Sequence, residues 1–529
     1  MKWVFFALYL AVLLLPQAFH EASASAFTYV LRQGPDNFVT ADSLSTLKAA
    51  CNTGKTILVP AGTYVITLYK GQNICAGLNA ITIRGNGKDV TKLIVRGSAK
   101  NYFDAFTVTG GTTIFRDMTV IFGVPMGGQG SFIGCNGGTG LQLINMRLTG
   151  NTAIIAGADT NATQMINFES KGCSHVLVRD TEFSGWANPL LKTNASTAAN
   201  ADLRFIGDYG HDNSGPALLF NSPNGKMDNV EVIGGLYENG GGLDCATSNS
   251  ALISAANVSH IVIRGVRFNG TTDRDAIHIE DNSSGEIVGN VFNITSPCRN
   301  FGTAITLLQN AVSGRPGIPH DFTISDNSIA GYGTATTGIK FAEQTWTQLS
   351  GGLVGSAGTD CRVGEKITLA NIGGSQKYPP TITVTSLAGE PSTGAAEVTI
   401  PDAAASEAGW FTSNPTSFAE SSASGACKGF TLVSPTFRTY QIPQTARISV
   451  RNNTIKGFET GIYEGRAFAS SVVKGNTITA IGTGIFVAYA NAEVEDNTII
   501  GAIGLGTRYG GTFGTNNVLD GSSPRDQTR

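Results

Sequence analysis

Short runs of aliphatic and β-branched residues recur along the chain, and each run is closed by Gly, Asn or Asp. The pattern is clearest in Val450–Gly457, Val473–Ala480 and Val494–Gly501, which share the phrase Val-X-X-Asn-Thr-Ile. The asparagine of this phrase returns every 20 to 23 residues, at Asn453, Asn476, Asn497 and Asn517. Short strands without helical periodicity between them predict an all-β, right-handed parallel β-helix in which each repeat forms one coil.

Weaker copies of the phrase precede this region and begin at Asn145, Asp180, Gly265, Asn290 and Asn327. An asparagine that repeats at one corner of a parallel coil can bond its amide to the copy in the next coil. We therefore interpret these asparagines as structural rather than catalytic residues.

The repeat is interrupted once. Asn327 and Asn453 are 126 residues apart, far more than one coil requires. The excess falls where Gly, Ser, Thr, Ala and Pro are abundant and where segments such as Lys366–Leu369 predict separate strands. We expect a parallel β-helix over residues 27–344, a small inserted β-rich domain over residues 345–444, and C-terminal coils over residues 445–529.

The first 26 residues have the pattern of a secretory signal peptide. Lys2 precedes an apolar run from Val4 to Leu15, and small residues near Ala24 and Ala26 supply cleavage positions. The run is shorter than the ~20 residues that a membrane-spanning helix needs. The sequence therefore predicts a secreted protein without a membrane span in its mature chain.

Composition agrees with a coil of tight corners, since the chain has 66 Gly and only 14% charged residues. A net charge of −3 argues against nucleic acid as a partner. Eight cysteines in an exported chain indicate disulfides, for which Cys51–Cys75 and Cys361–Cys427 are the simplest pairs. No Cys-X-X-Cys pair is present, which disfavours a zinc site.

The opening segments Leu44–Ala50, Thr56–Ile66 and Ile81–Gly87 resemble the entry to the pectate-lyase-like right-handed β-helix superfamily. The resemblance implies a short helix that caps the N-terminal end of the coil. It also implies a polysaccharide as substrate or ligand, because the superfamily includes lyases, hydrolases, epimerases, tailspikes and binding proteins. Val363–Leu369 resembles the entry to a β-rich module of phage structural proteins.

One strand pattern, a small residue followed by Leu or Ile and then a variable residue, recurs in the central coils. Strand residues alternate between faces, so the variable residues should point outward if the aliphatic ones point inward. The expected outward ladder consists of Leu219, Asp244, His278, Thr306, Lys340, Tyr463 and Phe486.

This ladder predicts the chemistry of a lyase or C5-epimerase that acts on a uronate-containing polysaccharide. Such an enzyme must neutralise the substrate carboxylate, remove the adjacent proton and, in a lyase, assist the leaving oxygen. We assign His278 or Lys340 as the base, Tyr463 as a proton donor and Asp244 as the acid beside His278. The expected substrate-binding residues near the ladder are Arg274, Arg299, Glu280 and Asp275.

Two alternatives use the same carboxylates. A glycoside hydrolase needs two carboxylates at ~5 to 9.5 Å, which Asp244 with Asp275 or Glu280 would supply. A Ca²⁺ site is the second alternative, built from Asp273, Asp275, Glu280 and Asp281, although the leading expectation is that no cofactor is needed. The main rival of the lyase or epimerase interpretation, placed before the hydrolase, is a non-catalytic, polysaccharide-binding or surface, tailspike-like adhesion protein.

A second motif lies in Gly207–Asn213. It resembles a phrase of mannuronan C5-epimerases, although the proline of that phrase is absent. The resemblance adds His211 and Asp212 as substrate-binding candidates. The simpler interpretation is a His-Asp pair that caps a turn.

Overall fold

The computed structural model describes residues 38–526 apart from several segments. The segments outside the described residues are 41–42, 52–55, 69–70, 98–102, 124–129, 151–162, 169–171, 187–190, 194–199, 214, 222–226, 241–250, 273–274, 297–301, 311–316, 334, 343–345, 373–374, 388–394, 400–409, 422–426, 441–445, 466–470, 488–491, 501–502, 508–515 and 521–522. The expected signal peptide, residues 1–26, also lies outside them.

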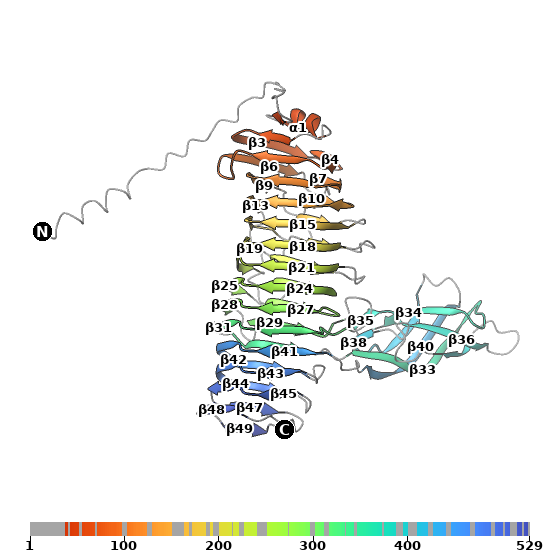
Figure 1. The fold of residues 1–529 in the computed structure, drawn as a ribbon. Coiled ribbons are helices and arrows are strands. Elements are labelled where there is room, and N and C mark those ends of the chain that lie inside the picture. The colour runs from red at the N-terminus through yellow and green to blue at the C-terminus, as the bar shows by residue number, and fades with distance from the viewer. Residues whose placement is uncertain are drawn as a thin grey trace.

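The main body is a right-handed parallel β-helix, as the sequence predicts, with three columns of strands (Figure 1). Column A, the first strand of each coil, contains β2 (Thr56–Val59), β5 (Thr82–Gly85), β8 (Thr113–Arg116), β12 (Leu141–Ile144), β15 (Cys173–Arg179), β18 (Asn200–Ile206), β21 (Met227–Ile233), β24 (Val258–Arg264), β27 (Gly285–Val288), β30 (Phe322–Ser325), β41 (Ile448–Arg451), β43 (Val472–Lys474) and β45 (Glu493–Glu495). The short strands β1 (Phe38–Thr40) and β11 (Gly138–Thr139) also pair in this sheet.

Column B follows in each coil and contains β3 (Gly62–Leu68), β6 (Thr91–Gly97), β9 (Thr119–Gly123), β13 (Arg147–Gly150), β16 (Glu182–Ser184), β19 (Tyr209–Asn213), β22 (Leu236–Gly240), β25 (Arg267–Thr272), β28 (Val291–Ser296), β31 (Ser328–Gly333), the first halves of β42 (Thr454–Glu464) and β44 (Thr477–Val487), β46 (Thr498–Ile500) and β48 (Val518–Asp520). The parallel register continues from coil to coil, so each strand contacts the coil before it and the coil after it.

Column C completes each coil and contains β4 (Cys75–Asn79), β7 (Phe103–Gly110), β10 (Gly130–Cys135), β14 (Thr163–Phe168), β17 (Leu191–Thr193), β20 (Leu218–Asn221), β23 (Ala251–Ala256), β26 (Asp275–Glu280), β29 (Thr303–Leu308), β32 (Thr337–Ala342), the second halves of β42 and β44, β47 (Ile503–Thr507) and β49 (Ser523–Asp526). Its inward residues stack in register as an aliphatic column of fully buried side chains, namely Ile277, Ile305, Ile339, Ile462 and Ile485.

The corner between columns A and B is held by the predicted asparagine ladder. Asn290 Nδ2 donates to Asn327 Oδ1 at 3.0 Å, and Asn327 donates in the same way to Asn453 at 2.9 Å. The series continues through Asn476, Asn497 and Asn517. Each donor amide from Asn290 to Asn497 also meets a backbone carbonyl, so the buried polar groups of this corner are satisfied.

The earlier members of the predicted phrase lie one position before the ladder. Asn145, Asp180 and Gly265 adopt a left-handed backbone with φ of 50°, 52° and 64°, as Asp326 and Asn452 do in later coils. Short polar residues and glycine tolerate this conformation, which turns the chain from column A into column B. The repeat therefore contains two corner residues, and the early coils retain the first of them.

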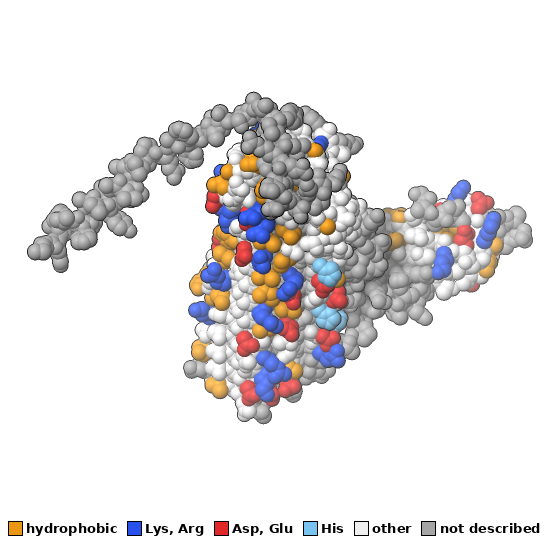
Figure 2. Space-filling view, turned by 45° about the horizontal axis from the view of Figure 1, so that its top comes forward, with side chains coloured by type: hydrophobic (Ala, Val, Ile, Leu, Met, Phe, Trp, Pro, Cys, Tyr) orange, Lys and Arg blue, Asp and Glu red, His pale blue; other side chains and the backbone are white. Residues whose placement is uncertain are grey.

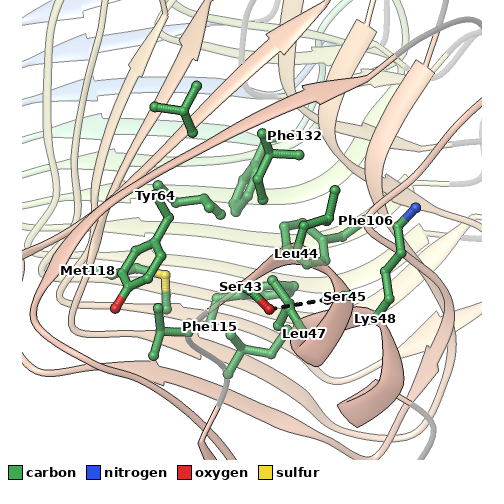
Figure 3. A pocket seen from close by; sticks show the side chains of 15 residues that line it. Ser43, Leu44, Ser45, Leu47, Lys48, Tyr64, Phe106, Phe115, Met118 and Phe132 are labelled. Atoms are coloured by element: carbon green, nitrogen blue, oxygen red, sulfur yellow. Dashed lines mark hydrogen bonds between the residues drawn. The ribbon is translucent and has the colours of Figure 1, made fainter. Parts of the chain in front are cut away.

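Helix α1 (Leu44–Ala50) lies at the N-terminal end of the coil, where the resemblance implies a cap. Ser43 accepts a hydrogen bond from the Thr46 backbone N–H, and Thr46 Oγ1 accepts one from the Ser43 N–H. A cavity of about 460 Å³ lies between α1 and the first coils, lined mainly by apolar side chains such as Leu47, Phe115 and Phe132 (Figure 3). No helix in the described ranges is long and apolar enough to cross a membrane.

Between β32 and β41 the chain forms a separate antiparallel sheet that projects sideways from the coil (Figure 1). Its eight strands are β33 (Trp346–Thr359), β34 (Lys366–Ile372), β35 (Ser375–Tyr378), β36 (Thr381–Leu387), β37 (Ala395–Thr399), β38 (Trp410–Ser413), β39 (Ser417–Glu420) and β40 (Lys428–Tyr440). The sheet has its own buried cluster, which includes Phe411, Phe418 and Phe430. β32 pairs with β42, so the coil resumes in register after this sheet.

Three disulfides lie in the described residues. Cys51–Cys75 and Cys361–Cys427 are the expected pairs, and Cys135–Cys173 is the third. Acidic and basic side chains lie close together on the face shown in Figure 2. Arg204 with Glu231, at 2.7 Å, is one ion pair of adjacent coils.

Candidate functional site

The outward ladder of column C has the predicted order from His278 onward. Successive register pairs join His278 to Thr306, Thr306 to Lys340, Lys340 to Tyr463, and Tyr463 to Phe486. The alternation is also as expected, because Ile277 is fully buried while the side chain of His278 keeps 14% of its surface exposed. The sequence therefore placed these five residues on one face of the coil.

Asp244 was wrongly placed in this ladder. The residue beside His278 in the preceding coil is Ser254, because β23 pairs Ile253 with Ile277 and Ser254 with His278. Gly242–Asp244 and the segment that ends at Ser254 both run from a small residue through aliphatic residues to a polar one. The pattern therefore matches too early in the sequence, because the connection before the true strand is longer than in the coils that follow it. Asp244 itself, together with Arg274 and Arg299, lies outside the described residues.

His278 is held between two carboxylates of its own strand. Its Nδ1 lies 2.5 Å from Asp275 Oδ2, and its Nε2 lies 2.6 Å from Glu280 Oε1. The next coil supports both acids, because Thr306 Oγ1 donates to Asp275 at 2.9 Å and Asn310 Nδ2 donates to Glu280 at 2.7 Å. The side chains of Asp275 and Glu280 keep 12% and 19% of their surfaces exposed. We name these three residues, Asp275, His278 and Glu280, the acid–histidine triad.

The geometry of the triad argues against His278 as the base. Burial opposes a charge on the ring, but the hydrogen bonds and attraction of Asp275 and Glu280 outweigh it and raise the pKa of His278 to about 10. The ring is then an imidazolium that donates both N–H groups, so no nitrogen lone pair is available to accept a proton. The same cation occupies the space between two of the carboxylates considered for Ca²⁺, and a third, Asp273, lies outside the described residues.

Lys340 and Tyr463 lie farther along the ladder than the triad. Lys340 is two coils from His278, a distance of about 10 Å along the axis at ~4.8 Å per coil. Tyr463 stacks on Phe486 with ring centroids 5.3 Å apart and an interplanar angle of 4°. These residues share a face with the triad but do not contact His278 directly.

His211 and Asp212 belong to a second cluster on column B. His211 Nδ1 lies 2.8 Å from Asp212 Oδ2, and its ring stacks on Tyr209 with centroids 4.3 Å apart. Within the described part of the chain, His211 Nε2 has no hydrogen-bond partner, and Glu182 Oε1 lies 3.8 Å from it. The Tyr209 hydroxyl donates to Glu238 at 2.5 Å, and this bond raises the pKa of Tyr209 to about 12.

Sequence reasoning missed several residues of both clusters. Glu182 and Glu238 come from the coils on either side of Tyr209 and His211, and register alone brings them together. Arg147 Nε donates to Glu182 at 2.9 Å from the coil before that. Asn310 follows β29, and the sequence carries no repeat signal at that position.

Glu464 is a further unforeseen group, located directly beneath the ladder. It occupies an inward position of column C between Phe341 and Val487 and is almost fully buried. Burial raises the pKa of its carboxyl to about 8, although the Ser471 hydroxyl donates a hydrogen bond to it. The contribution of this protonated acid to stability is complete below pH 4.5 and is lost as pH rises through about 8.

Comparisons with known proteins were made by sequence and by structure. No protein-family model and no curated protein sequence matches the chain. Similar solved structures include the A-module of mannuronan C-5 epimerase AlgE4 from Azotobacter vinelandii, with 13% identity over 57% of this chain and 88% of that chain and a TM-score of 0.31. The Dettilon tailspike protein gp208 has 11% identity over 93% of this chain and 68% of that chain, with a TM-score of 0.39.

The tailspike protein of E. coli bacteriophage HK620, solved in complex with a pentasaccharide, has 12% identity over 93% of this chain and 78% of that chain, with a TM-score of 0.37. Similarity at this level carries no argument about activity. By its own strand pairing the chain is a parallel β-helix protein, the architecture implied by its resemblance to the pectate-lyase-like superfamily.

Proposed function

We propose that the protein is an extracellular enzyme that hydrolyses a glycosidic bond of a polysaccharide at the acid–histidine triad. The observation that supports this most is the pair of carboxylates, buried Asp275 and half-buried Glu280, on either side of the His278 imidazolium. Glycoside hydrolysis needs one carboxyl group to protonate the leaving oxygen and another to activate water or attack the sugar. The disulfides fit an oxidising compartment outside the cytoplasm.

The roles follow from the contacts. Glu280, the more exposed acid, takes a proton from His278 Nε2 and passes it to the departing glycosidic oxygen. Asp275 accepts a proton from the water molecule that attacks the anomeric carbon. After the products leave, Asp275 releases this proton to solvent and His278 regains one from solvent, so both groups return to their starting states. Thr306 and Asn310 act as positioning residues, because each donates a hydrogen bond to one of the two carboxylates.

The first experiment incubates the purified protein with a panel of polysaccharides and measures new reducing ends and unsaturated-product absorbance together. Hydrolysis yields reducing ends without the absorbance. Glu280→Gln and Asp275→Asn should each lower turnover by ~10² or more, since they remove a proton-transfer group. Glu286→Gln, which removes an exposed acid paired with Arg264 on column A, is the matched control. Unchanged turnover in both triad variants would reject the site.

The second candidate function is the lyase or C5-epimerase reaction on a uronate polysaccharide, favoured by the cluster around His211. Asp212 holds Nδ1 of this ring, so Nε2 is the nitrogen oriented to accept a proton. Unsaturated products that disappear in His211→Gln but persist in His260→Gln would support this reaction. His260 is the appropriate control because it pairs with Asp228 at 2.9 Å on an exposed surface. Binding without new reducing ends, without unsaturated products and without a change in the uronate epimers of the polymer would favour the non-catalytic alternative.

A further inference from the structure

Lys340 is a half-buried cation without an ion-pair partner among the described side chains, and it lies on the same face as the triad. Several other cations on the coil are paired: Arg204 contacts Glu231 at 2.7 Å, and Lys474 contacts Glu495 at 2.5 Å. A partly desolvated ammonium gains most from an opposite charge that arrives with a ligand. The position of Lys340 thus indicates an anionic group on the substrate.

The spacing along the ladder defines where that group would lie. Thr306 separates His278 from Lys340, which places the ammonium about 10 Å along the coil axis from the triad. On the other side of Lys340 the ladder continues with the stacked pair Tyr463 and Phe486. Gly506 follows Phe486 in register.

These neighbours suggest how a glycan would lie on the coil. Aromatic rings provide apolar area at low entropic cost, with which the apolar face of a sugar can pack. A glycan chain parallel to the coil axis would therefore meet the carboxylate pair, then the cation, then the aromatic pair. This order requires the sugar two coils from the cleaved bond to carry the negative charge.

We propose that Lys340 selects anionic polysaccharides by pairing with a carboxylate or sulfate on a sugar about two coils from the triad. The inference rests on the proposed function, because it takes the triad as the place of cleavage. In this role Lys340 is a specificity-determining residue, not the base that the sequence suggested.

The test compares variants on two polymers that differ only in charge. The full-length protein is assayed on an acidic polysaccharide of the panel and on the same polymer after chemical reduction of its carboxyl groups. Lys340→Met should lower kcat/KM on the acidic polymer about tenfold, mainly through KM, which is the effect of losing one charge-assisted hydrogen bond. Lys340→Arg should retain most of the preference because it keeps the charge.

Lys456→Met is the matched control, since Lys456 is an exposed cation on column B. Its kinetics on both polymers should equal those of the unchanged protein. Equal losses for Lys340→Met on the acidic and the reduced polymer, or a preference of the unchanged protein for the reduced polymer, would overturn the proposal. If no polymer is cleaved at all, the proposed hydrolysis fails, and the same two polymers immobilised as affinity columns still test the charge selection by retention.

Discussion

His278 shows why an outward position in a strand does not make a side chain unimportant for stability. The alternation of strand residues predicts that outward substitutions change stability little, within ~0.5 kcal/mol. In the structure, however, His278 is the only group of the triad that compensates the charges of Asp275 and Glu280. Removing it leaves two poorly solvated acids near each other, so we expect a substitution of His278 to cost more stability than the alternation alone predicts.

The prediction is that His278→Gln lowers the free energy of unfolding by about 3 kcal/mol at pH 6, the cost of breaking a largely buried ion pair. The pKa of His278 is raised from 6.5 to about 10 in the folded state. Its stabilising contribution is therefore complete below pH 6.5 and is lost as pH rises through about 10. Chemical denaturation at several pH values should show the difference from the unchanged protein shrinking on the alkaline side. His260→Gln should change little at any pH.

The sequence could identify the ladder but not the contacts of its members. The small-aliphatic-variable pattern placed Thr306, Lys340, Tyr463 and Phe486 correctly because each coil repeats it after the same inward isoleucine. The two carboxylates that contact His278 lie three positions before it and two positions after it in the sequence. Strand alternation does not predict that Asp275, three positions away, reaches the same face as His278. The placement of Asp244 in the ladder was wrong because a tripeptide of similar pattern precedes the true strand.

At the scale of the element, an earlier coil carries a carboxyl group at the corner position that an asparagine amide fills in the asparagine ladder. Asp208 occupies in an earlier coil the position that Asn290 fills later, and its Oδ1 accepts the Thr181 backbone N–H at 2.9 Å as Asn290 accepts that of Val266. Among the described residues Asp208 Oδ2 has no hydrogen-bond partner. Burial raises the pKa of this carboxyl well above its ordinary range.

The prediction is that Asp208→Asn raises the free energy of unfolding at pH 7 by about 1 to 2 kcal/mol, since it replaces a buried unpaired acceptor with an amide donor. An acid whose folded pKa is raised contributes stability below its unfolded pKa of ~3.9 and loses it as pH rises. The gain should therefore grow as pH rises above about 4. Asn290→Asp is the reciprocal control and should destabilise the protein over the same range. A loss of stability in Asp208→Asn would contradict this assignment.

At the scale of the whole molecule, the asparagine ladder passes the insertion without a break. Asn327 bonds directly to Asn453 although 126 residues separate them in sequence. The segments before and after the insertion belong to consecutive coils. The regular spacing of the phrase in the sequence therefore revealed where the insertion lies. The strand order within the inserted sheet did not follow from the sequence, since its pairings are antiparallel and link distant segments such as β33 and β40.

The prediction is that a chain lacking residues 345–444 still folds, because each coil chiefly contacts its neighbours. The shortened connection from β32 to β41 would contain residues 343–344 and 445–447, similar to the link of residues 281–284 between β26 and β27. A soluble product with a single cooperative thermal transition is expected, and Glu280→Gln in this background should still lower turnover by ~10² or more. Aggregation or a broad, uncooperative transition would count against the insertion.

The base of the inserted sheet has a mechanical consequence. Trp346 and Tyr440, where the chain leaves and re-enters, are paired residues of β33 and β40. When an attached surface pulls on the inserted sheet, the force therefore reaches the coil through one two-stranded ribbon. The hydrogen bonds between coils, by contrast, run along the coil axis, so a force along this axis is shared by the three columns. Under a sideways force, the strand pair of β33 and β40 would separate before the coil unfolds. The face that carries Asp275, His278 and Glu280 would then keep its structure.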